Sequence, residues 1–389
     1  MLAANIADYR ALARRRLPHF LFEYVDGGAF AEATLRQNVS DFESLPLKQK
    51  ILGGVGDTNI ATTVLGQNLA MPVILAPIGL AGLNARRGEI QACRAAQAAG
   101  VPFILSTMSV CAMEEVRAKT EPFWFQLYVM RDRGFMKAMI ARAQEAGCKA
   151  LVFTVDMPVP GVRYRDMRSG LSAGGPIARR LKRLGQALAR PGWVWDVGLL
   201  GRPHTLGHVA SALGERAGIE EYWGWAGRNF DPTVTWKDIA AIRELWKGPL
   251  IVKGILDPDD ARAAADIGVE GVVVSNHGGR QLDGALSSIR ALPSIAKAVG
   301  HRTTVLMDGG IRTGADIVRA LCMGARGVLI GRAWAWALAA RGQAGVTHAL
   351  QILEKEMRVA MALTGATRIS DLNPDRLDLR GLKELGFGS

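Results

Sequence analysis

A histidine and an arginine three positions apart stand out in residues 271–283, which read GVVVSNHGGRQLD. His277 can accept a proton near neutral pH, and Arg280 can bind a carboxylate or phosphate through two parallel N–H groups. The pair therefore suits a reaction on an anion, in which one group holds the negative charge and the other moves a proton. A loop histidine beside a solvated arginine is an equally good interpretation of this stretch alone, so the other segments must decide.

The residues before His277 predict the element that positions it. The run Val272, Val273 and Val274 is typical of a strand buried on both faces, and it stops at the glycine-containing segment 275–280. In a parallel α/β barrel, residues just past the C-terminal ends of the strands line the mouth that holds the active site. We therefore expect this histidine and the arginine after it at such a mouth.

Short apolar runs recur eight times along the chain, and each predicts a strand of the same sheet. They lie at residues 73–77, 102–106, 123–129, 151–156, 249–254, 271–276, 304–309 and 327–332. Segments rich in alanine and charge separate them, and all spacings but one suit a strand–loop–helix–loop unit. This alternation predicts the α/β class and a single (β/α)8 TIM barrel. A doubly wound sheet is the alternative, but it does not explain why polar residues follow nearly every strand.

Two further features accompany the predicted barrel. Residues 5–17 and 19–29 predict N-terminal helices, the first with Asn5 as its N-cap. The one long spacing lies between strands 4 and 5, where residues about 172–235 form an insertion. We expect one domain over residues 1–380, with the insertion as part of it.

Polar residues or glycines follow all eight runs, and a barrel would bring them to one face. Their number indicates a single large polar ligand in the mouth. Glycine loops after the last two strands would admit a phosphate to backbone N–H groups, with two arginines adding positive charge. Because no G-x-G-x-x-G follows the first strand, a nicotinamide dinucleotide is disfavoured. In chain order the residues are Pro77, Ile78, Gly79, Ser106, Gln126, Tyr128, Thr154, Asp156, Lys253, Ser275, His277, Arg280, Asp308, Gly309, Gly310, Arg312, Gly331 and Arg332.

Composition narrows the class of protein. Apolar residues make up 49% of the chain, enough for a large core. We expect no secretory signal at the N-terminus, and residues 58–85, although uncharged, contain prolines and glycines that argue against a membrane-spanning helix. The cysteines form no CxxC pair and no metal-like spacing, so we expect reduced core thiols of a cytoplasmic protein and no metal site. The four are Cys93, Cys111, Cys148 and Cys322.

The insertion carries an amphipathic pattern of its own. Four apolar residues fall on one narrow stripe of a helix, while basic residues face away from it and two tryptophans follow. Such a segment suits an anionic membrane surface, and we expect residues 177–200 to dock there. Packing of the stripe on the barrel is the alternative, and nucleic acid is a less favoured partner for the net charge of +12. The residues are Ile177, Leu181, Leu184 and Leu188 in the stripe, Arg179, Lys182, Arg183 and Arg190 opposite it, and Trp193 and Trp195.

Taken together, the motifs resemble the family of FMN-dependent L-2-hydroxy-acid dehydrogenases and oxidases, over about residues 5–375. The segments that carry the likeness appear in order: QLYV at 126–129, TVD at 154–156, Lys253 at the end of the fifth run, SNHGGRQLD at 275–283 and DGGIRTG at 308–314. FLFEYVDGGA, LSTMSVC, FQLYVMRDRGFM, NFDPTVTWKD and KGILDPDDA together resemble most closely the bacterial respiratory, quinone-linked L-lactate dehydrogenases. Many oxidases of the family carry Thr-Ala where this chain has Ile78-Gly79, so the flavin environment differs there.

This resemblance implies a role for each matched residue. Substrate-binding residues would be Tyr24, Tyr128, Arg163, His277 and Arg280, with Tyr24 and the two arginines on the substrate carboxylate. Catalytic residues would be His277 as the base, Asp156 as the carboxylate that orients it, Tyr128 on the substrate oxygen and Lys253 beside the flavin. The remaining strand-end residues would bind FMN: Pro77, Ile78, Gly79, Ser106, Gln126, Thr154, Lys253 and Ser275 at the ring and ribityl, and Asp308, Gly309, Gly310, Arg312, Gly331 and Arg332 at the ribityl end and phosphate.

The expected reaction is oxidation of L-lactate to pyruvate on FMN, with electrons passed to a membrane quinone. The base would take its proton from the hydroxyl, with hydride transfer, or from C2, with a carbanion. A soluble oxidase that uses O2 and a mandelate-type dehydrogenase with a larger substrate are the alternatives. We expect a peripheral protein on the cytoplasmic face of the inner membrane, with a soluble cytoplasmic enzyme as the alternative, and a homo-oligomer such as a tetramer.

Overall fold

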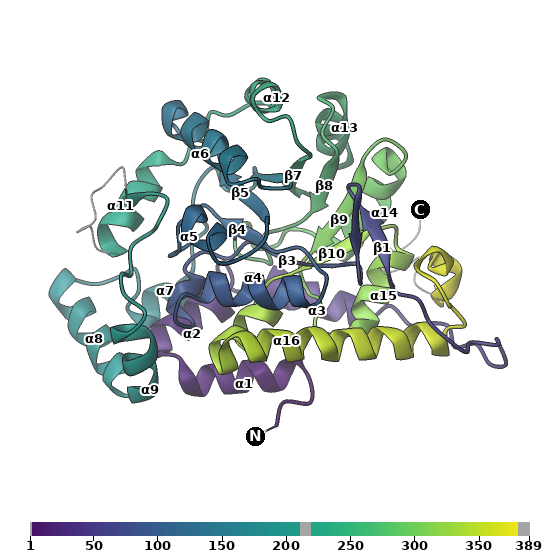
Figure 1. The fold of residues 1–389 in the computed structure, drawn as a ribbon, viewed down its shortest axis with the longest axis horizontal. Coiled ribbons are helices and arrows are strands. Elements are labelled where there is room, and N and C mark those ends of the chain that lie inside the picture. The colour runs from purple at the N-terminus through teal and green to yellow at the C-terminus, as the bar shows by residue number, and fades with distance from the viewer. Residues whose placement is uncertain (1, 211–218, 380–389) are drawn as a thin grey trace.

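Eight parallel strands form the centre of the molecule in a computed structural model that describes residues 2–210 and 219–379 (Figure 1). Their order in the sheet is β3-β10-β9-β8-β7-β6-β5-β4, and a parallel bridge between Leu75 and Phe103 joins the two ends. The predicted (β/α)8 barrel is therefore confirmed, and each predicted run overlaps one strand. The strands are β3 (Val73–Leu75), β4 (Ile104–Ser106), β5 (Trp124–Tyr128), β6 (Leu151–Thr154), β7 (Leu250–Ile255), β8 (Gly271–Val274), β9 (Thr304–Asp308) and β10 (Gly327–Ile330).

Helices surround the barrel, and the strands read as continuous apolar runs because both of their faces are buried. Inward residues such as Ile74, Val152 and Val273 fill the interior in one cluster, with 0% of their surface exposed. The outward residues pack beneath the helical layer. Its members are α4 (Gly88–Ala98), α5 (Met113–Arg117), α6 (Arg133–Glu145), α12 (Trp236–Leu245), α13 (Pro258–Asp266), α14 (Ser288–Val299), α15 (Gly314–Cys322) and α16 (Arg332–Leu363).

Three helices precede the barrel, of which the sequence predicted two. α1 (Ile6–Arg16) begins where the side chain of Asn5 accepts a hydrogen bond from the backbone N–H of Asp8, and it lies alongside α16 (Figure 1). α2 (His19–Asp26) follows directly. The third helix, α3 (Ala33–Glu43), was not predicted, and it packs on the loop after β9.

An antiparallel hairpin closes the amino-terminal end of the barrel. β1 (Thr62–Val64) and β2 (Gln67–Leu69) place two apolar side chains, those of Val64 and Leu69, in the cluster that fills the barrel. Gln67 also accepts a hydrogen bond from the indole N–H of Trp124, the first residue of β5, at 3.1 Å. The uncharged stretch 58–85 is thus a hairpin and a buried strand, and no helix among the described residues is long and apolar enough to span a bilayer.

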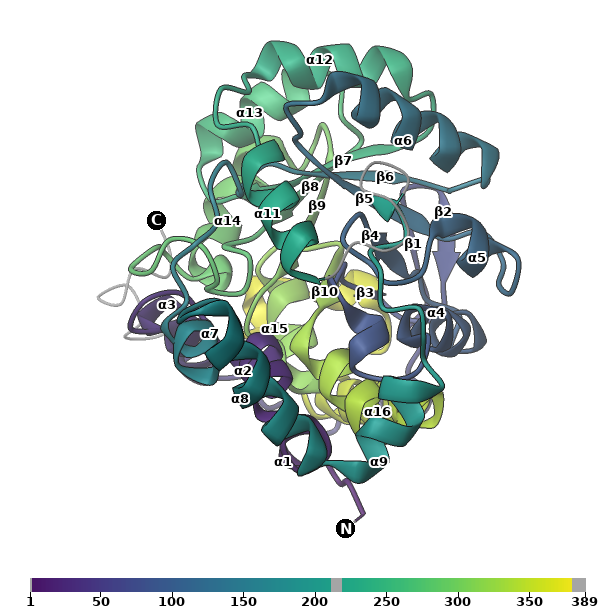
Figure 2. The ribbon, with the colours of Figure 1, turned by 90° about the vertical axis from the view of Figure 1, so that its left-hand side faces the viewer.

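The chain between β6 and β7 forms a separate group of short helices. They are α7 (Tyr164–Ser169), α8 (Pro176–Leu188), α9 (Pro191–Trp193), η2 (Val194–Leu199) and α11 (Ile219–Asn229). α8 lies across α2 and α7 (Figure 2). Several of its contacts are polar: the side chain of Gln186 donates to Ser169 O and accepts from the backbone N–H of Phe20, and Lys182 donates to Arg168 O. Ala187, on the same side of α8, packs against the core.

The apolar stripe of α8 faces solvent instead of the barrel. Ile177, Leu181, Leu184 and Leu188 are 77%, 63%, 52% and 64% exposed, so the helix is attached by its polar side. One part of the expectation is wrong, because Trp193 is buried and donates through its indole N–H to Leu83 O at 2.8 Å. Trp195, in contrast, is 64% exposed.

The four cysteines are core residues, and so are two tryptophans of the helix α16. Cys93, Cys111, Cys148 and Cys322 are all buried and form no disulfide. Burial raises the pKa of the Cys93 thiol to about 12, which keeps it protonated and unreactive. Trp334 and Trp336 of α16 are buried as well, and they pack between this helix and the barrel.

Candidate active site

The carboxyl ends of the strands surround one cavity. Its lining includes most of the predicted site residues and none of the polar groups from the opposite end of the barrel. The predicted residues that line it are Tyr24, Pro77, Ile78, Gly79, Tyr128, Thr154, Arg163, Lys253, His277, Arg280, Asp308, Gly309, Gly310, Arg312, Gly331 and Arg332. The predicted residues Ser106, Gln126, Asp156 and Ser275 lie directly behind this lining, in contact with it.

His277 and Asp156 form a partly buried pair at the centre. The Nδ1 of His277 lies 2.9 Å from an Asp156 carboxylate oxygen, although 121 residues separate the two in sequence. The main chain of His277 has a φ of 56°, a left-handed conformation that is uncommon outside glycine, and its N–H donates to the Ser275 hydroxyl at 3.0 Å. The pairing leaves Nε2 as the ring nitrogen that can take a proton from a ligand.

A glycine in β7 makes room for this carboxylate. Gly254 has a φ of +113°, and the pairing of β7 with β8 shifts register between Lys253 and Ile255. A Cβ atom at Gly254 would lie only 2.5 Å from the Cβ of Asp156, far inside contact distance. The irregular strand end therefore lets Asp156 sit behind His277 while the preceding lysine still points into the barrel.

Lys253 lies in a network with two polar partners. Its Nζ is 2.9 Å from an Asp308 carboxylate oxygen and donates to the Ser275 hydroxyl at 2.9 Å. Burial lowers the pKa of this ammonium, but the carboxylates of Asp308 and Asp156 outweigh burial and raise it above its ordinary value. The lysine is therefore a fixed positive charge beneath the cavity.

Two guanidinium groups and two tyrosines face His277. Arg280 lies over the ring of Tyr24, with 5.1 Å between its Cζ and the ring centroid. Arg163 lies next to it and is held by Arg280 O at 3.4 Å and by Asp166 at 3.9 Å. Burial and the nearby Arg280 charge lower the pKa of Arg163 to about 10, so it stays charged at neutral pH. An anion bound here would relieve the repulsion between the two cations.

Arginines also fix the helix that carries Tyr24. Arg280 Nη1 donates to Tyr24 O and Gly27 O, both at 2.7 Å. Arg332 donates to Asp26 O, Gly27 O and Gly278 O at 3.2, 2.8 and 2.9 Å. The carbonyls of Tyr24, Asp26 and Gly27 lie at the end of α2, where the last carbonyls of a helix lack partners within it and cations are favoured. The barrel mouth therefore caps α2 and holds Tyr24 over the cavity.

The electrostatics of the site suit a base that is neutral before the reaction. Burial lowers the pKa of His277 below its ordinary 6.5, opposed by Asp156 and reinforced by Lys253 and Arg163. For Asp156, burial favours the protonated form, but the His277 and Lys253 charges prevail and lower its pKa, so it is ionised. Burial also raises the pKa of Tyr128, which keeps its hydroxyl protonated as a donor. A neutral imidazole with an ionised partner is the arrangement of a general base.

The loops after β9 and β10 provide the glycine-rich end of the cavity. Gly309 and Gly310 have φ values of +94° and +90°, and a Cβ at Gly310 would lie 1.9 Å from Asn38 O. A Cβ at Gly331, in contrast, would meet nothing within 4 Å, so its backbone borders open space. Arg312 is partly buried beside the cavity, with its Cζ 5.0 Å from the centroid of the Trp336 ring, and desolvation lowers its pKa to about 10.

Some lining residues were not predicted from the sequence. Phe230 follows α11 and contacts the ring of Tyr128 edge-on, with centroids 5.4 Å apart. It belongs to the segment NFDPTVTWKD, which carried the resemblance without being given a role. Met108 and Met157 follow β4 and β6 and complete the apolar side of the cavity. Apolar residues in loops have no periodic signal, so only the structure identifies them.

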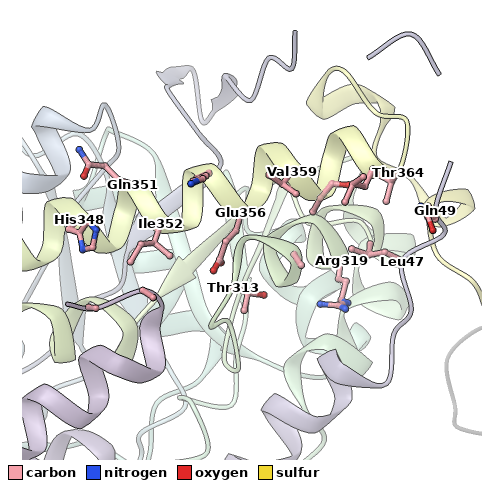
Figure 3. A pocket seen from close by; sticks show the side chains of 16 residues that line it. Leu47, Gln49, Thr313, Arg319, His348, Gln351, Ile352, Glu356, Val359 and Thr364 are labelled. Atoms are coloured by element: carbon pink, nitrogen blue, oxygen red, sulfur yellow. The ribbon is translucent and has the colours of Figure 1, made fainter. Parts of the chain in front are cut away.

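A second hollow lies outside the barrel, along α16 (Figure 3). Leu47, Thr313, Glu356 and Val359 are among the residues that line it, and His348 shares a 2.7 Å hydrogen bond with Tyr9 there. It contains none of the strand-end groups described above. Among the described residues no group of three or more His, Cys, Asp or Glu side chains is placed to hold a metal.

The comparison with protein families gives one assignment that covers nearly the whole chain. The model of the FMN-dependent dehydrogenases matches residues 13–379. The chain belongs to this family. Among relatives of the FMN-dependent dehydrogenase described here, an L-lactate dehydrogenase of Caulobacter vibrioides is 60% identical over 96% of this chain and 97% of that protein. An L-lactate dehydrogenase of Stenotrophomonas maltophilia is 59% identical over 97% of this chain and 99% of that protein.

Solved structures of similar FMN-dependent dehydrogenases and oxidases share the fold. The monotopic membrane protein (S)-mandelate dehydrogenase superposes with a TM-score of 0.90, at 35% identity over 97% of this chain and 100% of that one. A mandelate oxidase superposes with a TM-score of 0.81, at 36% identity over 97% and 98%. The family resemblance drawn from the sequence is confirmed.

FMN is the cofactor of the family, and this FMN-dependent dehydrogenase has buried polar groups that fit it. Gln126 Nε2, Thr154 Oγ1 and Asp308 Oδ1 are buried beside the cavity without a hydrogen-bond partner among the described residues. Unpaired buried polar atoms are costly, so their clustering at one cavity indicates a ligand that pairs with them. The glycine loops and Arg312 provide the open, positively charged end that a phosphate needs.

Proposed function

We propose that this FMN-dependent dehydrogenase oxidises L-lactate to pyruvate. The observation that carries the proposal is the cavity in which the His277–Asp156 pair lies with two partly buried guanidinium groups, those of Arg163 and Arg280. Relatives 57–60% identical to the chain bear the name L-lactate dehydrogenase, and they support lactate among the 2-hydroxy acids.

The substrate would be held by its carboxylate. Arg163 and Arg280 can pair with a planar carboxylate through their N–H groups, and the hydroxyl of Tyr24 is close enough to add a donor. The protonated hydroxyl of Tyr128 would donate to the substrate oxygen. These contacts would bring the 2-carbon and its hydroxyl next to His277, with bulk water kept out by α2 and Phe230.

His277 would then take the proton that the substrate loses. Asp156 stabilises the imidazolium that forms, since its carboxylate lies 2.9 Å from Nδ1. FMN, when bound, supplies the acceptor for the two electrons that leave the substrate. Lys253 would lie near the polar edge of the ring, where its fixed charge favours the added negative charge. Thr154, Gln126 and the strand-end backbone would hold the ring, and Arg312, with the glycine loops, the phosphate.

The first test is the colour of the protein. The purified chain should be yellow, and L-lactate should bleach it in the absence of oxygen. The His277→Ala variant should keep the colour but bleach at least about a hundredfold more slowly, because the base is lost. Bleaching of this variant at the normal rate would refute the proposed base. L-mandelate and longer 2-hydroxy acids, compared by kcat/KM, separate a lactate enzyme from a mandelate-type enzyme.

We further propose that electrons pass to a quinone of the cytoplasmic membrane, on which the protein docks peripherally. The support is α8, whose polar side contacts the protein while Ile177, Leu181, Leu184 and Leu188 face solvent. A helix that exposes its apolar side is favourable only where that side is covered, and the exposed Arg180 and Lys182 of the same helix suit anionic lipid. Trp195 and Leu200 extend this surface at 64% and 50% exposure.

Vesicle binding tests the docking surface. The chain should sediment with vesicles of anionic phospholipid, and Leu181→Asp should reduce this binding without changing the bleaching rate. Leu245→Asp is the matched control, because Leu245 is an exposed leucine of α12, away from the stripe. Equal sedimentation of both variants would contradict the proposed surface. Stoichiometric hydrogen peroxide from aerobic lactate, with no rate gain from added quinone, would favour the soluble oxidase.

We also propose that the chain forms a homo-oligomer. Val359 and Leu363 are 51% and 55% exposed on one turn of α16, and the Lys50 N–H donates to Leu363 O at 2.9 Å. This bond places the exposed Ile51 and Leu52 near the end of the same helix, so apolar side chains gather on one side of the molecule. Sedimentation of the wild type against Val359→Lys tests whether this surface joins copies of the chain.

A further inference from the structure

A second apolar cavity lies beneath α8. It has a volume of about 300 Å³, at the lower end of the range for small-molecule sites. Its lining comes from α2, from α8, from the residues that follow β3 and from the chain just after α7, and half of the lining residues are leucines. Among those are Leu21, Leu80, Leu83, Leu171 and Leu184.

The cavity adjoins the two surfaces that the proposed function requires. At its inner end, Tyr24 lines both this cavity and the active-site cavity, so one aromatic ring lies between them. At its outer end, Leu184 belongs to the exposed stripe of α8. The cavity therefore extends from the proposed membrane surface to the wall of the flavin site.

The main chain at the inner end supports this connection. Gly79 lines the active-site cavity, and the next residue, Leu80, lines the apolar one. Leu80 has a φ of 60°, a strained conformation for a leucine, and its N–H is held by Met108 O at 2.9 Å. Two consecutive residues, Gly79 and Leu80, therefore line the active-site cavity and the apolar cavity, respectively. Such strain is maintained when the surroundings fix it, and it concentrates at functional sites.

We propose that this cavity binds the ring of the membrane quinone that reoxidises the flavin, an inference that rests on the proposed acceptor. A quinone has a flat, largely apolar ring, two carbonyl oxygens and a long hydrocarbon tail. The apolar lining suits the ring, and Arg180 and Arg183 also border the cavity, mainly through the apolar parts of their side chains. The tail would leave along the stripe of α8 into lipid.

The reaction balances without a further reactant. L-lactate loses two electrons and two protons when its C–OH becomes the C=O of pyruvate. The quinone gains two electrons and two protons when its carbonyl oxygens become the hydroxyls of the quinol. The active-site cavity is a poor alternative for the quinone, because Arg163, Arg280 and Lys253 favour a small anion, and a hydrocarbon tail would displace their polar contacts.

Filling the cavity tests the proposal. Ala187 lines it from α8, so Ala187→Trp would occupy the space of the ring. The matched control is Ala178→Trp, which adds the same side chain at an exposed position of the same helix, outside the lining. The full-length holoenzyme is reduced with L-lactate without oxygen and then mixed with a ubiquinone analogue bearing a ten-carbon tail, or with ferricyanide as a water-soluble acceptor.

We expect the yellow colour to return about tenfold or more slowly with the quinone in the Ala187→Trp variant, and at the normal rate with ferricyanide. The Ala178→Trp control should match the wild type with both acceptors. Return of colour at the wild-type rate in both variants would overturn the cavity proposal. If Ala187→Trp does not yield folded yellow protein, Ala187→Leu is the smaller replacement and should raise the KM for the quinone.

The two proposals fail in different ways. If the wild type itself is not reoxidised by the quinone, the proposed acceptor is wrong and the cavity proposal falls with it. If the wild type uses the quinone and filling the cavity has no effect, only the cavity proposal is wrong. A lipid chain as the occupant predicts that Ala187→Trp weakens vesicle binding and keeps the quinone rate, which would also overturn the assignment.

Discussion

Replacement of Asp156 by Asn isolates the charge behind the base, because the amide keeps the shape and a hydrogen-bond acceptor for His277 Nδ1. The pair lies 2.9 Å apart in a buried site. At an effective dielectric constant of about 20, two unit charges at this distance attract by roughly 6 kcal/mol. This attraction exists only after His277 has taken its proton, so its loss raises the barrier.

The net effect should be smaller than the full attraction. The amide oxygen retains part of the hydrogen bond to His277 Nδ1, which offsets part of the lost attraction. We expect a loss of about 4 kcal/mol, which corresponds to a roughly thousandfold lower rate of flavin bleaching by L-lactate. The measurement is a rapid-mixing experiment without oxygen, with the bound FMN content checked first.

The pH dependence gives an independent measure of the same interaction. Asp156 raises the pKa of His277, so its removal lowers that pKa further. The acid limb of kcat/KM, where His277 becomes protonated, should therefore move to lower pH in Asp156→Asn. Asp41→Asn is the control, since Asp41 is a buried carboxylate paired with Arg290 at 2.8 Å outside the cavity lining. A loss of less than about tenfold with an unmoved acid limb would refute the electrostatic role.

Two further predictions concern the residues around this pair. Gly254→Ala should lower the thermal midpoint and the bleaching rate, because its Cβ would lie 2.5 Å from the Cβ of Asp156. Gly268→Ala is the control: Gly268 has a φ of +82° and no atom within 4 Å of the added Cβ, so the change should cost only about 1 kcal/mol of stability and no activity. Calorimetry measures the stability and kinetics the activity. Lys253→Met leaves the Asp308 carboxylate without its cation, so we expect about 3–5 kcal/mol lower stability in denaturant unfolding and a lower flavin reduction potential. The double variant with Asp308→Asn should recover stability but not the potential.

The sequence was sufficient to predict the barrel, because strands buried on both faces leave uninterrupted apolar runs and their polar ends recur in step. It also identified the strand-end residues that now surround one cavity, with Lys253 and His277 as examples. The segment α3 was missed because its apolar residues are few, although it supports the site: Asn38 exchanges two amide hydrogen bonds with Asn276, at 2.9 and 2.8 Å.

Contacts between distant segments could not be predicted from local patterns. The hydrogen bonds from Arg280 and Arg332 to the end of α2 join residues more than 250 positions apart, and nothing in either stretch specifies the other. The direction in which α8 faces was open for the same reason, since an amphipathic pattern shows that a helix has two sides but not which of them meets the protein. Trp193 was expected at the membrane surface together with Trp195, because the local sequence does not show that only one of the two tryptophans is exposed.

The hairpin that closes one end of the barrel limits the routes by which reactants can reach the flavin. With β1 and β2 sealing that end, whatever approaches the flavin must come through the opposite rim. A water-soluble acid and a lipid-soluble oxidant would then reach the flavin from the same end of the barrel by separate routes, one over the exposed loops and the other under α8. Separate routes for the two reactants would let the acid reduce the flavin, and the quinone reoxidise it, without either reactant blocking the other.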